Sequence, residues 1–534
     1  MSDAMHPISI TSAASESQPR ANSKPTEQFQ LPRLCLTGLS GDCGQNSLCE
    51  LLAAAFRIHF VETSTHPSGS QQYGQNLRIF EVYEDPDRRQ RLEFICGQSA
   101  ISLDPWIQDR EMLLYSLYRY SFALRLALIS GRGSLFDSEL YSANSSSDAS
   151  ASPVTASPEA LARCLETPII LIVDASEMRS QLLPLIRACL DYAEPSLVQG
   201  LILTRVEEED YSPLKSYLEA ELKLPVFGYM SLEVERSWRH ACRRADWRAS
   251  LQELAEALFE SLELEGLLKL AEASAALEKR IPESILQLQH QYGSRTSSLR
   301  IAYADDPAFD LSYRENLDAF ADLGIELIPF SPLYDAELPR EIDGIYLSSN
   351  RIKSYLPELS QRRDMRRQIY QAVDRGCPLL ADSEAYLFLC RHIYASDDVN
   401  AWPMLALLEQ DFSLRTQMSS AARNEIYVEW ICLTQSAAAR YQYRARARLN
   451  KQLIPERGSG DFQLRLVQSR EQFACLGGDE GFTAIPARLY LRAHPRHLRC
   501  FIDSCFDYRK QRQADELQES TQVYDFQKSS RGLA

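Results

Sequence analysis

Residues 299–330 read LRIAYADDPAFDLSYRENLDAFADLGIELIPF, and this stretch decides the fold of the C-terminal half of the chain. Apolar segments at 299–304 and 325–330 have the length of buried strands, and the residues between them carry apolar side chains at helical spacing. Further apolar segments follow at 344–347 and 378–382, again with a helical segment between them. Strands that alternate with helices predict a parallel sheet, and ligands bind at the carboxyl ends of such strands.

Four motifs in this region carry a resemblance to a known family: DPAF (306–309), YRENL (313–317), FSPL (330–333) and DGIYL (343–347). They resemble the glutaminase domain of the cobyrinic acid a,c-diamide synthase family, and weaker similarity extends over most of residues 33–505. Members of that family use ATP and glutamine to amidate two carboxylates of a corrin ring. The resemblance implies an α/β protein with two doubly wound domains, one with a P-loop-type parallel sheet and one with a flavodoxin-like sheet of the class I glutaminase type.

The composition narrows the function classes. A chain of 534 residues is long enough for two or three domains with buried cores. Its formal net charge of −16 argues against nucleic acid as a partner, and no apolar run is long enough to cross a membrane. The 13 cysteines form no CxxC pair, and the N-terminal residues show no signal-peptide pattern. We therefore expect reduced thiols in a cytoplasmic protein without a cysteine metal site.

The expected domain layout follows from the composition and the resemblance together. Residues 1–29 are rich in Ser, Pro, Gln and Thr without apolar periodicity, and YSANSSSDASASPVTASP is a Ser- and Ala-rich insertion. The expected units are, in chain order, a disordered tail (1–30), a P-loop amidoligase-like domain (31–280) with the low-complexity loop 141–158, a linker (281–298), a class I glutaminase-like domain (299–508) and a flexible tail (509–534).

A short apolar strand at 34–37 leads into GLSGDCGQNS (38–47) and then into a helical segment at 48–56. Strand, glycine-containing loop and helix is the layout of a phosphate-binding loop, in which backbone N–H groups and the helix N-terminus hold an anion. The resemblance implies a degenerate form of the family's nucleotide site, with nucleotide-binding positions at Gly38, Ser40, Gly44, Gln45, Asn46, Ser47 and, after a later strand, Thr204.

Two of these positions differ from the family in a way that matters chemically. Gln45 takes the place of the loop lysine, and Asn46 takes the place of the hydroxyl residue that would hold magnesium. A charged hydrogen bond contributes about 1.5–3 kcal/mol, so loss of the lysine weakens triphosphate binding and removes charge that stabilises phosphoryl transfer. Two interpretations stay open: a turn that keeps its glycines only for backbone shape, and a nucleotide site in which the Gln45 amide still donates.

The resemblance also implies a degenerate metal site. In ISGRGSLFDS, Ser130 takes the place of a glutamate that is the family's expected magnesium ligand, and Asp137 is retained. A neutral hydroxyl is a poor ligand for magnesium, which prefers anionic oxygens. We therefore expect neither residue to bind metal and Asp137 to cap a turn; ATP and magnesium are cofactors only if the protein is active. LDPW (103–106) resembles a segment near the family's ring-binding face.

Glutaminase chemistry requires a cysteine thiolate at a sharp strand-to-helix turn, a histidine base and backbone donors for the oxyanion. The segment ADSEAYLFL aligns with the family's turn, and Ser383 takes the place of the cysteine. Near the C-terminus the register places Arg488 and Tyr490 at the family's histidine positions. We expect Ser383 and Tyr490 to be inactive, and the nearby His494 and His497 to be surface residues.

Two functions from different classes fit these substitutions. The first, which we favour, is a pseudoenzyme without glutaminase and with weak or no ATP-dependent amidoligase activity, retained for binding a tetrapyrrole or a protein partner. The second is an active ATP-dependent carbon–nitrogen ligase that amidates carboxylates of a corrinoid or sirohaem-type tetrapyrrole with free ammonia. A cation from another segment at the loop, or an imidazole at Ser383, would count against the first. A homodimer stays open for both.

Overall fold

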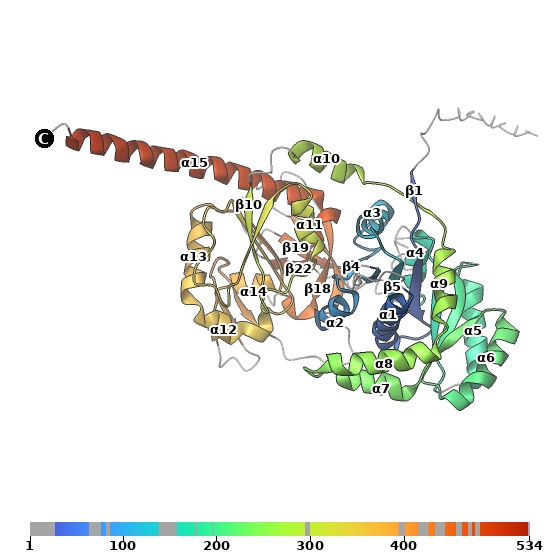
Figure 1. The fold of residues 1–534 in the computed structure, drawn as a ribbon. Coiled ribbons are helices and arrows are strands. Elements are labelled where there is room, and N and C mark those ends of the chain that lie inside the picture. Colours follow the sequence, from blue (N-terminus) through green and yellow to red (C-terminus); the bar gives the residue numbers. More distant parts are fainter. Residues whose placement is uncertain are drawn as a thin grey trace, which may run out of the picture.

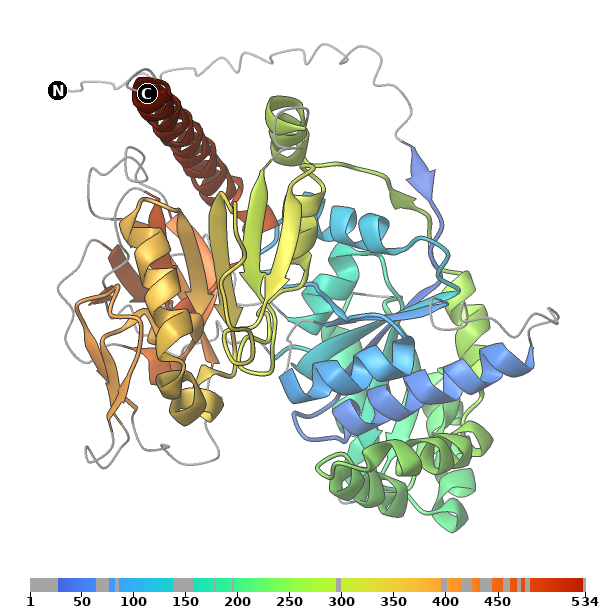
Figure 2. The same cartoon turned by 60° about the vertical axis from the view of Figure 1, so that its left-hand side comes forward.

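The chain forms two parallel sheets with separate cores, which lie side by side (Figures 1 and 2). The predicted fold class, α/β with two doubly wound units, is confirmed. The computed structural model describes residues 27–63, 76–81, 86–137, 157–176, 179–194, 196–293, 299–394, 401–414, 425–432, 444–454, 462–467, 472–475 and 481–531.

The N-terminal unit is built on a seven-stranded sheet in the order β4-β3-β5-β2-β6-β7-β8, and all of its strand pairs are parallel. Its strands are β2 (Arg33–Gly38), β3 (Leu77–Glu81), β4 (Ile101–Ser102), β5 (Leu126–Ser134), β6 (Ile169–Asp174), β7 (Val198–Thr204) and β8 (Val226–Met230). Because β2 lies in the middle, the loop that follows it opens beside the carboxyl ends of β5 and β6, where parallel sheets hold ligands.

Helices cover both faces of this sheet, which explains why its strands are continuous apolar runs. Along β2, Leu34 and Leu36 face one core while Cys35 faces the other. The first core contains residues of α1 (Gln45–Glu62), α2 (Pro86–Cys96), α7 (Leu232–Ala241), α8 (Trp247–Ser261) and α9 (Leu264–Glu272). The second contains residues of α3 (Arg110–Tyr120), α4 (Pro158–Cys164), α5 (Arg179–Tyr192) and α6 (Glu208–Leu222).

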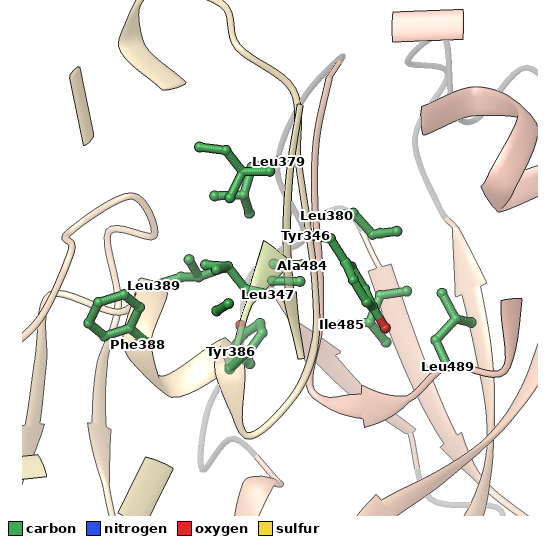
Figure 3. Close-up of a cluster of buried hydrophobic side chains, with 14 of the residues drawn as sticks. Tyr346, Leu347, Leu379, Leu380, Tyr386, Phe388, Leu389, Ala484, Ile485 and Leu489 are labelled. Carbon is green, nitrogen blue, oxygen red and sulfur yellow. The ribbon is translucent and has the colours of Figure 1, made fainter. Parts of the chain in front are cut away.

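The C-terminal unit is built on a five-stranded parallel sheet in the order β11-β10-β12-β13-β21. Its strands are β10 (Arg300–Ala304), β11 (Glu326–Phe330), β12 (Gly344–Ser349), β13 (Leu379–Ser383) and β21 (Phe482–Ile485), and its helices include α11 (Glu315–Ala321), α12 (Leu356–Gln361), α13 (Arg363–Asp374) and α14 (Ala385–Leu389). Figure 3 shows the apolar side chains that fix the turn from β13 into α14, among them Tyr386, Phe388 and Ile485.

An antiparallel sheet that the sequence reading did not anticipate adjoins this unit, in the order β20-β19-β17-β18-β22. Its strands are β17 (Glu425–Cys432), β18 (Arg444–Asn450), β19 (Phe462–Leu466), β20 (Gln472–Cys475) and β22 (Ala487–Arg488), and a further small sheet joins β14 (His392–Tyr394), β15 (Ala401–Pro403) and β16 (Asp411–Ser413). The strict alternation RARARLN in β18 is the signal for such a strand, because alternate side chains face opposite sides of a sheet.

The structure differs from the expected layout at three segments. The expected N-terminal tail ends early, because β1 (Gln28–Phe29) pairs with β9 (Leu277–Glu278). The expected linker contains α10 (Glu283–Tyr292), and the expected C-terminal tail continues α15 (Pro495–Arg531), which extends beyond the body in Figures 1 and 2. Leu288 and Tyr292 of α10 pack into the core of the C-terminal unit. This burial explains why a helix forms where a linker was expected. Of the low-complexity loop 141–158, only the last two residues are described.

The two units meet through buried polar contacts rather than through an apolar patch alone. Tyr120 donates a hydrogen bond of 2.6 Å to Asp318, and Arg89 of α2 contacts Asp310 and the carbonyl of Leu311. Within the described part of the chain, no helix combines the length and the apolar character that crossing a bilayer requires. The cysteines whose side chains the structure describes are free thiols, and most of these are buried.

Candidate functional site

The loop between β2 and α1 keeps a backbone path that only glycine permits at two points. A Cβ on Gly38 would lie 2.4 Å from the sulfur of Cys43, and Gly44 has a φ of +76° at the start of α1. Thr204 holds the loop from the neighbouring strand, because its hydroxyl donates to the carbonyl of Cys43 at 2.8 Å. The Thr204 side chain is fully buried, so it fixes the loop instead of facing a base.

The Gln45 side chain turns back into the protein. Its amide nitrogen donates to the carbonyl of Leu36 at 2.9 Å and also to the carbonyl of Gly131. Both amide protons are therefore used on backbone carbonyls, which only the NH₂ group can satisfy. The interpretation in which the Gln45 amide donates to a nucleotide is not supported by this geometry.

A pocket of about 390 Å³ lies directly beside the loop, within the range of small-molecule sites. Of the seven predicted nucleotide-binding positions, Gly44, Gln45, Asn46 and Ser47 line it, whereas Gly38, Ser40 and Thr204 do not. Arginines from two other helices complete the wall: Arg88, Arg91, Arg239 and, just after α7, Arg243. Sequence reasoning missed this arginine cluster because its members come from segments far apart in the chain.

A guanidinium group occupies the neighbourhood of the predicted metal position. Arg88 donates to Glu50 at 3.1 Å and contacts Glu81 and, at 3.4 Å, the hydroxyl of Ser130. Ser130 lines the pocket, but Asp137 does not. No cluster of three or more His, Cys, Asp or Glu residues suited to a metal occurs in the described ranges. The residues present therefore do not fit magnesium, because the carboxylates near Ser130 are already bonded to a cation.

Arg205 ties the loop to the ends of two strands. It donates to Glu235 at 2.6 and 2.9 Å, to Asp174 at 2.6 Å and to the carbonyl of Asp42 at 2.8 Å. Hydrogen bonding by Glu235 raises the pKa of Arg205, so the group stays charged. The Glu235 carboxylate lies against Gly44, where an added Cβ would meet it at 3.0 Å. A carboxylate of the chain itself therefore lies close to the helix N-terminus.

Cations from other segments thus reach the loop, which was one of the two observations set against the pseudoenzyme interpretation. Most of them are matched by acids: Arg88 and Arg91 pair with Glu50, and Arg239 lies 3.5 Å from Glu235. The arrangement retains the means to attract an anion, but it offers no free lysine-like charge from within the loop.

Ser383 ends β13 at a sharp turn and has a φ of +57°, a strained value for a residue with a side chain. Its hydroxyl donates to the side-chain carbonyl of Asn350 at 2.9 Å and is buried. Among the described residues no imidazole is bonded to this oxygen; His494, for comparison, contacts the carbonyl of Arg446 at 2.8 Å. An imidazole at Ser383, the second observation that would count against the pseudoenzyme interpretation, is therefore not found among the described residues.

A buried ion pair fills the place where the family resemblance implies glycine. Glu384, which follows Ser383, contacts the Lys353 ammonium at 2.7 Å and is 3% exposed. Burial raises the pKa of Glu384, and the charge of Lys353 opposes this. Lys353 also donates to Gln452 at 2.7 Å. Side chains thus occupy the approach that an oxyanion would need to reach backbone donors.

The burial of Asp382 predicts a pH dependence of stability in this region. Burial raises its pKa to about 6, partly opposed by hydrogen bonds from Ser348 and Tyr346. Between about pH 4 and 6 the folded state therefore holds a proton that the unfolded state releases, so the free energy of unfolding falls as pH rises through this window, by about 3 kcal/mol. Asp382→Asn should remove this decline. Urea unfolding of both proteins from pH 4.5 to 7 tests it; a constant difference between them would contradict the assignment.

The structure does not bring Tyr490 to Ser383. The Tyr490 hydroxyl lies 3.4 Å from that of Ser116 in the N-terminal unit, and its ring packs edge-on against Tyr313 with centroids 5.3 Å apart. Tyr490 is thus part of the contact between the units. The expectation of surface histidines is wrong for His494, which is 4% exposed; burial lowers its pKa to about 4.

The LDPW segment is also part of this contact and not of an open face. Asp104 accepts a hydrogen bond of 2.6 Å from Arg448, and both side chains are buried. Trp106 packs against Tyr427 with centroids 5.8 Å apart and lies under the Arg446 guanidinium at 4.1 Å. The predicted position near a ring-binding face is therefore covered by the C-terminal unit.

Comparison with known proteins agrees with this architecture. Residues 300–441 match the family of CobB/CobQ-like glutamine amidotransferase domains. The cobyrinate a,c-diamide synthase of Caldanaerobacter subterraneus subsp. tengcongensis is 27% identical over 327 residues, which cover 60% of this chain and 68% of that protein. Those of Thermoplasma volcanium (26% identical, covering 70% of this chain and 76% of that one) and Listeria innocua (29%, covering 59% and 67%) are similar too.

The unit around Ser383 is thus a glutamine amidotransferase-like domain. The chain is similar to cobyrinate a,c-diamide synthases at 26–29% identity, as the motifs at 306–347 implied. Among solved structures, chloroplast FtsY from Physcomitrella patens matches with a TM-score of 0.24 and 15% identity, over 39% of this chain and 59% of that chain.

Proposed function

We propose that this protein is a non-catalytic member of the family that binds a tetrapyrrole with free carboxylates and does not hydrolyse glutamine. The contacts of Ser383 carry the proposal: its hydroxyl donates to Asn350, and the next residue, Glu384, is ion-paired with Lys353. A serine hydroxyl without a base is a weak nucleophile, and loss of a catalytic triad member lowers turnover by about 10⁶-fold in a well-studied protease.

Two observations support an anionic tetrapyrrole as the ligand. The relatives named above are cobyrinate a,c-diamide synthases, so their substrate carries carboxylates. Four guanidinium groups line one pocket of this chain, and arginine pairs with carboxylates through two parallel hydrogen bonds. The two retained sheets, together with a neutral Ser130 where the family resemblance implies a glutamate, are consistent with a binding protein derived from such an enzyme.

Restoring the nucleophile alone should not restore glutaminase activity. We expect Ser383→Cys to release ammonia from glutamine at the background rate, because the thiol would still lack a base and Glu384 and Lys353 would still fill the approach. An enzyme-coupled ammonia assay measures this, with the Listeria innocua relative as the active control. Release by the wild-type chain that disappears in Ser383→Ala would contradict the proposal.

Ligand binding is tested with cobyrinic acid, followed by its absorbance and by tryptophan fluorescence. We expect saturable binding in the micromolar range, with the recovered ligand unchanged in mass after incubation with ATP, magnesium and glutamine. Absence of binding would refute the tetrapyrrole assignment.

A second candidate, an ATP-dependent ligase that uses free ammonia, is favoured by one observation, the cluster of arginines beside the loop. Formation of ADP together with an amidated corrinoid, when ammonium replaces glutamine, would establish it and would overturn the non-catalytic proposal. Unchanged ATP under those conditions would remove it.

A further inference from the structure

A groove of about 450 Å³ lies along the second half of α1, between α2 and α8, and Figure 2 shows α1 between these two helices. Ile58, Leu251 and Ala255 line it with apolar side chains. Two larger apolar side chains of the same lining are exposed, Val61 at 50% and Phe94 at 42%. Exposed apolar side chains that gather in one place mark a surface for a partner. We call this surface the α1–α8 groove.

Four charged side chains at the rim of the groove have no partner of opposite charge. They are Arg57, Glu62, Arg248 and Glu256, all exposed, and none of them forms an ion pair with a described residue. Arg57 donates to the carbonyl of Phe94 at 3.2 Å, and the Arg248 guanidinium lies 4.8 Å above the Phe94 ring. The rim therefore carries two cations and two carboxylates that stay available to a partner.

The helices α1 and α8 run in the same direction along the groove. Near their starts, the Trp238 indole donates to Glu50 of α1 at 3.1 Å, and its ring centroid lies 6.3 Å from that of Trp247, the first residue of α8. Near their ends, the ring centroids of His59 and Phe259 are 6.2 Å apart. Positions along the two helices can therefore be compared directly.

The charges at the rim are separated by sign. Arg57 and Arg248 lie at one end of the groove, because both contact Phe94. Glu62 follows Arg57 on α1, and Glu256 follows Arg248 on α8. At about 1.5 Å per residue, the two acidic residues are about 7 and 12 Å farther along their helices. The groove thus has a cationic end (Arg57 and Arg248) and an acidic end (Glu62 and Glu256).

Two of these charges lie at the less favourable end of their own helix. Glu62 is the last residue of α1, and Arg248 belongs to the first turn of α8. A carboxylate at a helix C-terminus and a cation at a helix N-terminus both oppose the helix dipole. A partner that brings a cation to Glu62 and a carboxylate to Arg248 would offset both.

We propose that a second copy of this chain docks on the α1–α8 groove, groove against groove, in a two-fold symmetric dimer. A two-fold interface uses the same surface of both copies, so that surface must be complementary to itself. Antiparallel placement of the two grooves sets the cationic end of each copy on the acidic end of the other and covers Val61 and Phe94. A partner of a single charge sign would instead be repelled at one end of the groove.

Sedimentation equilibrium of the full chain, from about 1 to about 200 µM, tests whether the dimer forms. We expect a monomer–dimer equilibrium with a Kd in the micromolar range, as for a small interface with exposed charges at its rim. A chain that stays monomeric at about 200 µM, or that forms only larger assemblies, would overturn the proposal. The measurement needs no ligand. A dimer that binds no cobyrinic acid would refute the proposed function alone, and a monomer that binds it would refute the dimer alone.

An exchange of charges tests the two-fold arrangement. Arg248→Glu and Glu256→Arg should each weaken self-association about tenfold, because like charges then meet at both ends of the interface. In an equimolar mixture of the two variants, the heterodimer again brings opposite charges together, so its affinity should return to within about threefold of the wild-type value. A mixture that associates no more tightly than its separate components would overturn the proposed arrangement.

Matched controls separate this surface from net charge and from general hydrophobicity. Glu253→Arg makes the same charge change on α8 as Glu256→Arg, but Glu253 does not line the groove, so the Kd should stay within about twofold. Val61→Lys should weaken the dimer about tenfold or more, whereas Leu185→Lys on α5, where the side chain is 42% exposed, should leave it unchanged. Thermal unfolding at about 1 µM, where monomers prevail, verifies that each variant is folded. Equal effects within either matched pair would show that the dimer forms elsewhere and would overturn the proposal.

Discussion

Replacing Arg88 by methionine is expected to lower the free energy of unfolding of the N-terminal unit by about 3–5 kcal/mol, the cost of breaking a buried ion pair from one side. Glu50 and Glu81 are 2% and 1% exposed at their side chains, so two nearly buried carboxylates would each lose a cation, although Glu50 would keep Arg91. Urea unfolding followed by circular dichroism measures the loss.

Arg91 is the matched control for this variant. It pairs with the same Glu50 at 2.9 Å, but its side chain is more exposed than that of Arg88, at 13% against 7%. Arg91→Met should therefore cost less than half as much as Arg88→Met. Equal losses would mean that Arg88 is not the central cation of the cluster.

A compensating variant separates charge from packing. When Arg88→Met is combined with Glu50→Gln and Glu81→Gln, the buried negative charges disappear together with their cation, and most of the lost stability should return. If stability falls further instead, the hydrogen bonds of the carboxylates matter more than their charge; Trp238, which donates to Glu50 at 3.1 Å, is the contact to examine.

The sequence predicts the sheets well because their signal is local. The predicted strands 344–347 and 378–382 of the C-terminal unit are short apolar runs bounded by turns, which is the pattern of strands buried on both faces. The positions of Ser383 and Gln45 follow from the same local alignment. Within the described residues, these elements appear where the pattern placed them, give or take two residues.

The contacts that the side chains of the site make could not be predicted, because they join segments that are separated in the sequence. Gln45 is tied to Gly131, and Glu384 pairs with Lys353 in the 3₁₀ helix that follows β12, so each outcome depends on a residue from another segment of the chain. Loss of a lysine in the loop indicates a changed site, but only the packed structure shows that four arginines gather next to it.

Replacing Arg448 by methionine should have the second large effect, a loss of about 3–5 kcal/mol in the contact between the two units. Arg448 of β18 donates to Asp104 at 2.6 Å, and the two side chains are 3% and 2% exposed. Asp104 belongs to the N-terminal unit, so its carboxylate would be left facing the other unit without this cation. Because the units then hold together less strongly, we expect two separate thermal transitions in the variant and coupled transitions in the wild-type protein.

Arg446→Met is the control for Arg448→Met, and the added change Asp104→Asn should restore stability to that variant. Arg446 is exposed and lies over the Trp106 ring, a contact of about 0.5–1 kcal/mol, so Arg446→Met should leave the transitions coupled. Adding Asp104→Asn to Arg448→Met removes the stranded carboxylate and should recover more than half of the loss, because an amide costs far less to bury than an ion. If the double variant is no more stable than Arg448→Met alone, the units are held by the aromatic contacts of Trp106 and Tyr427 rather than by this ion pair.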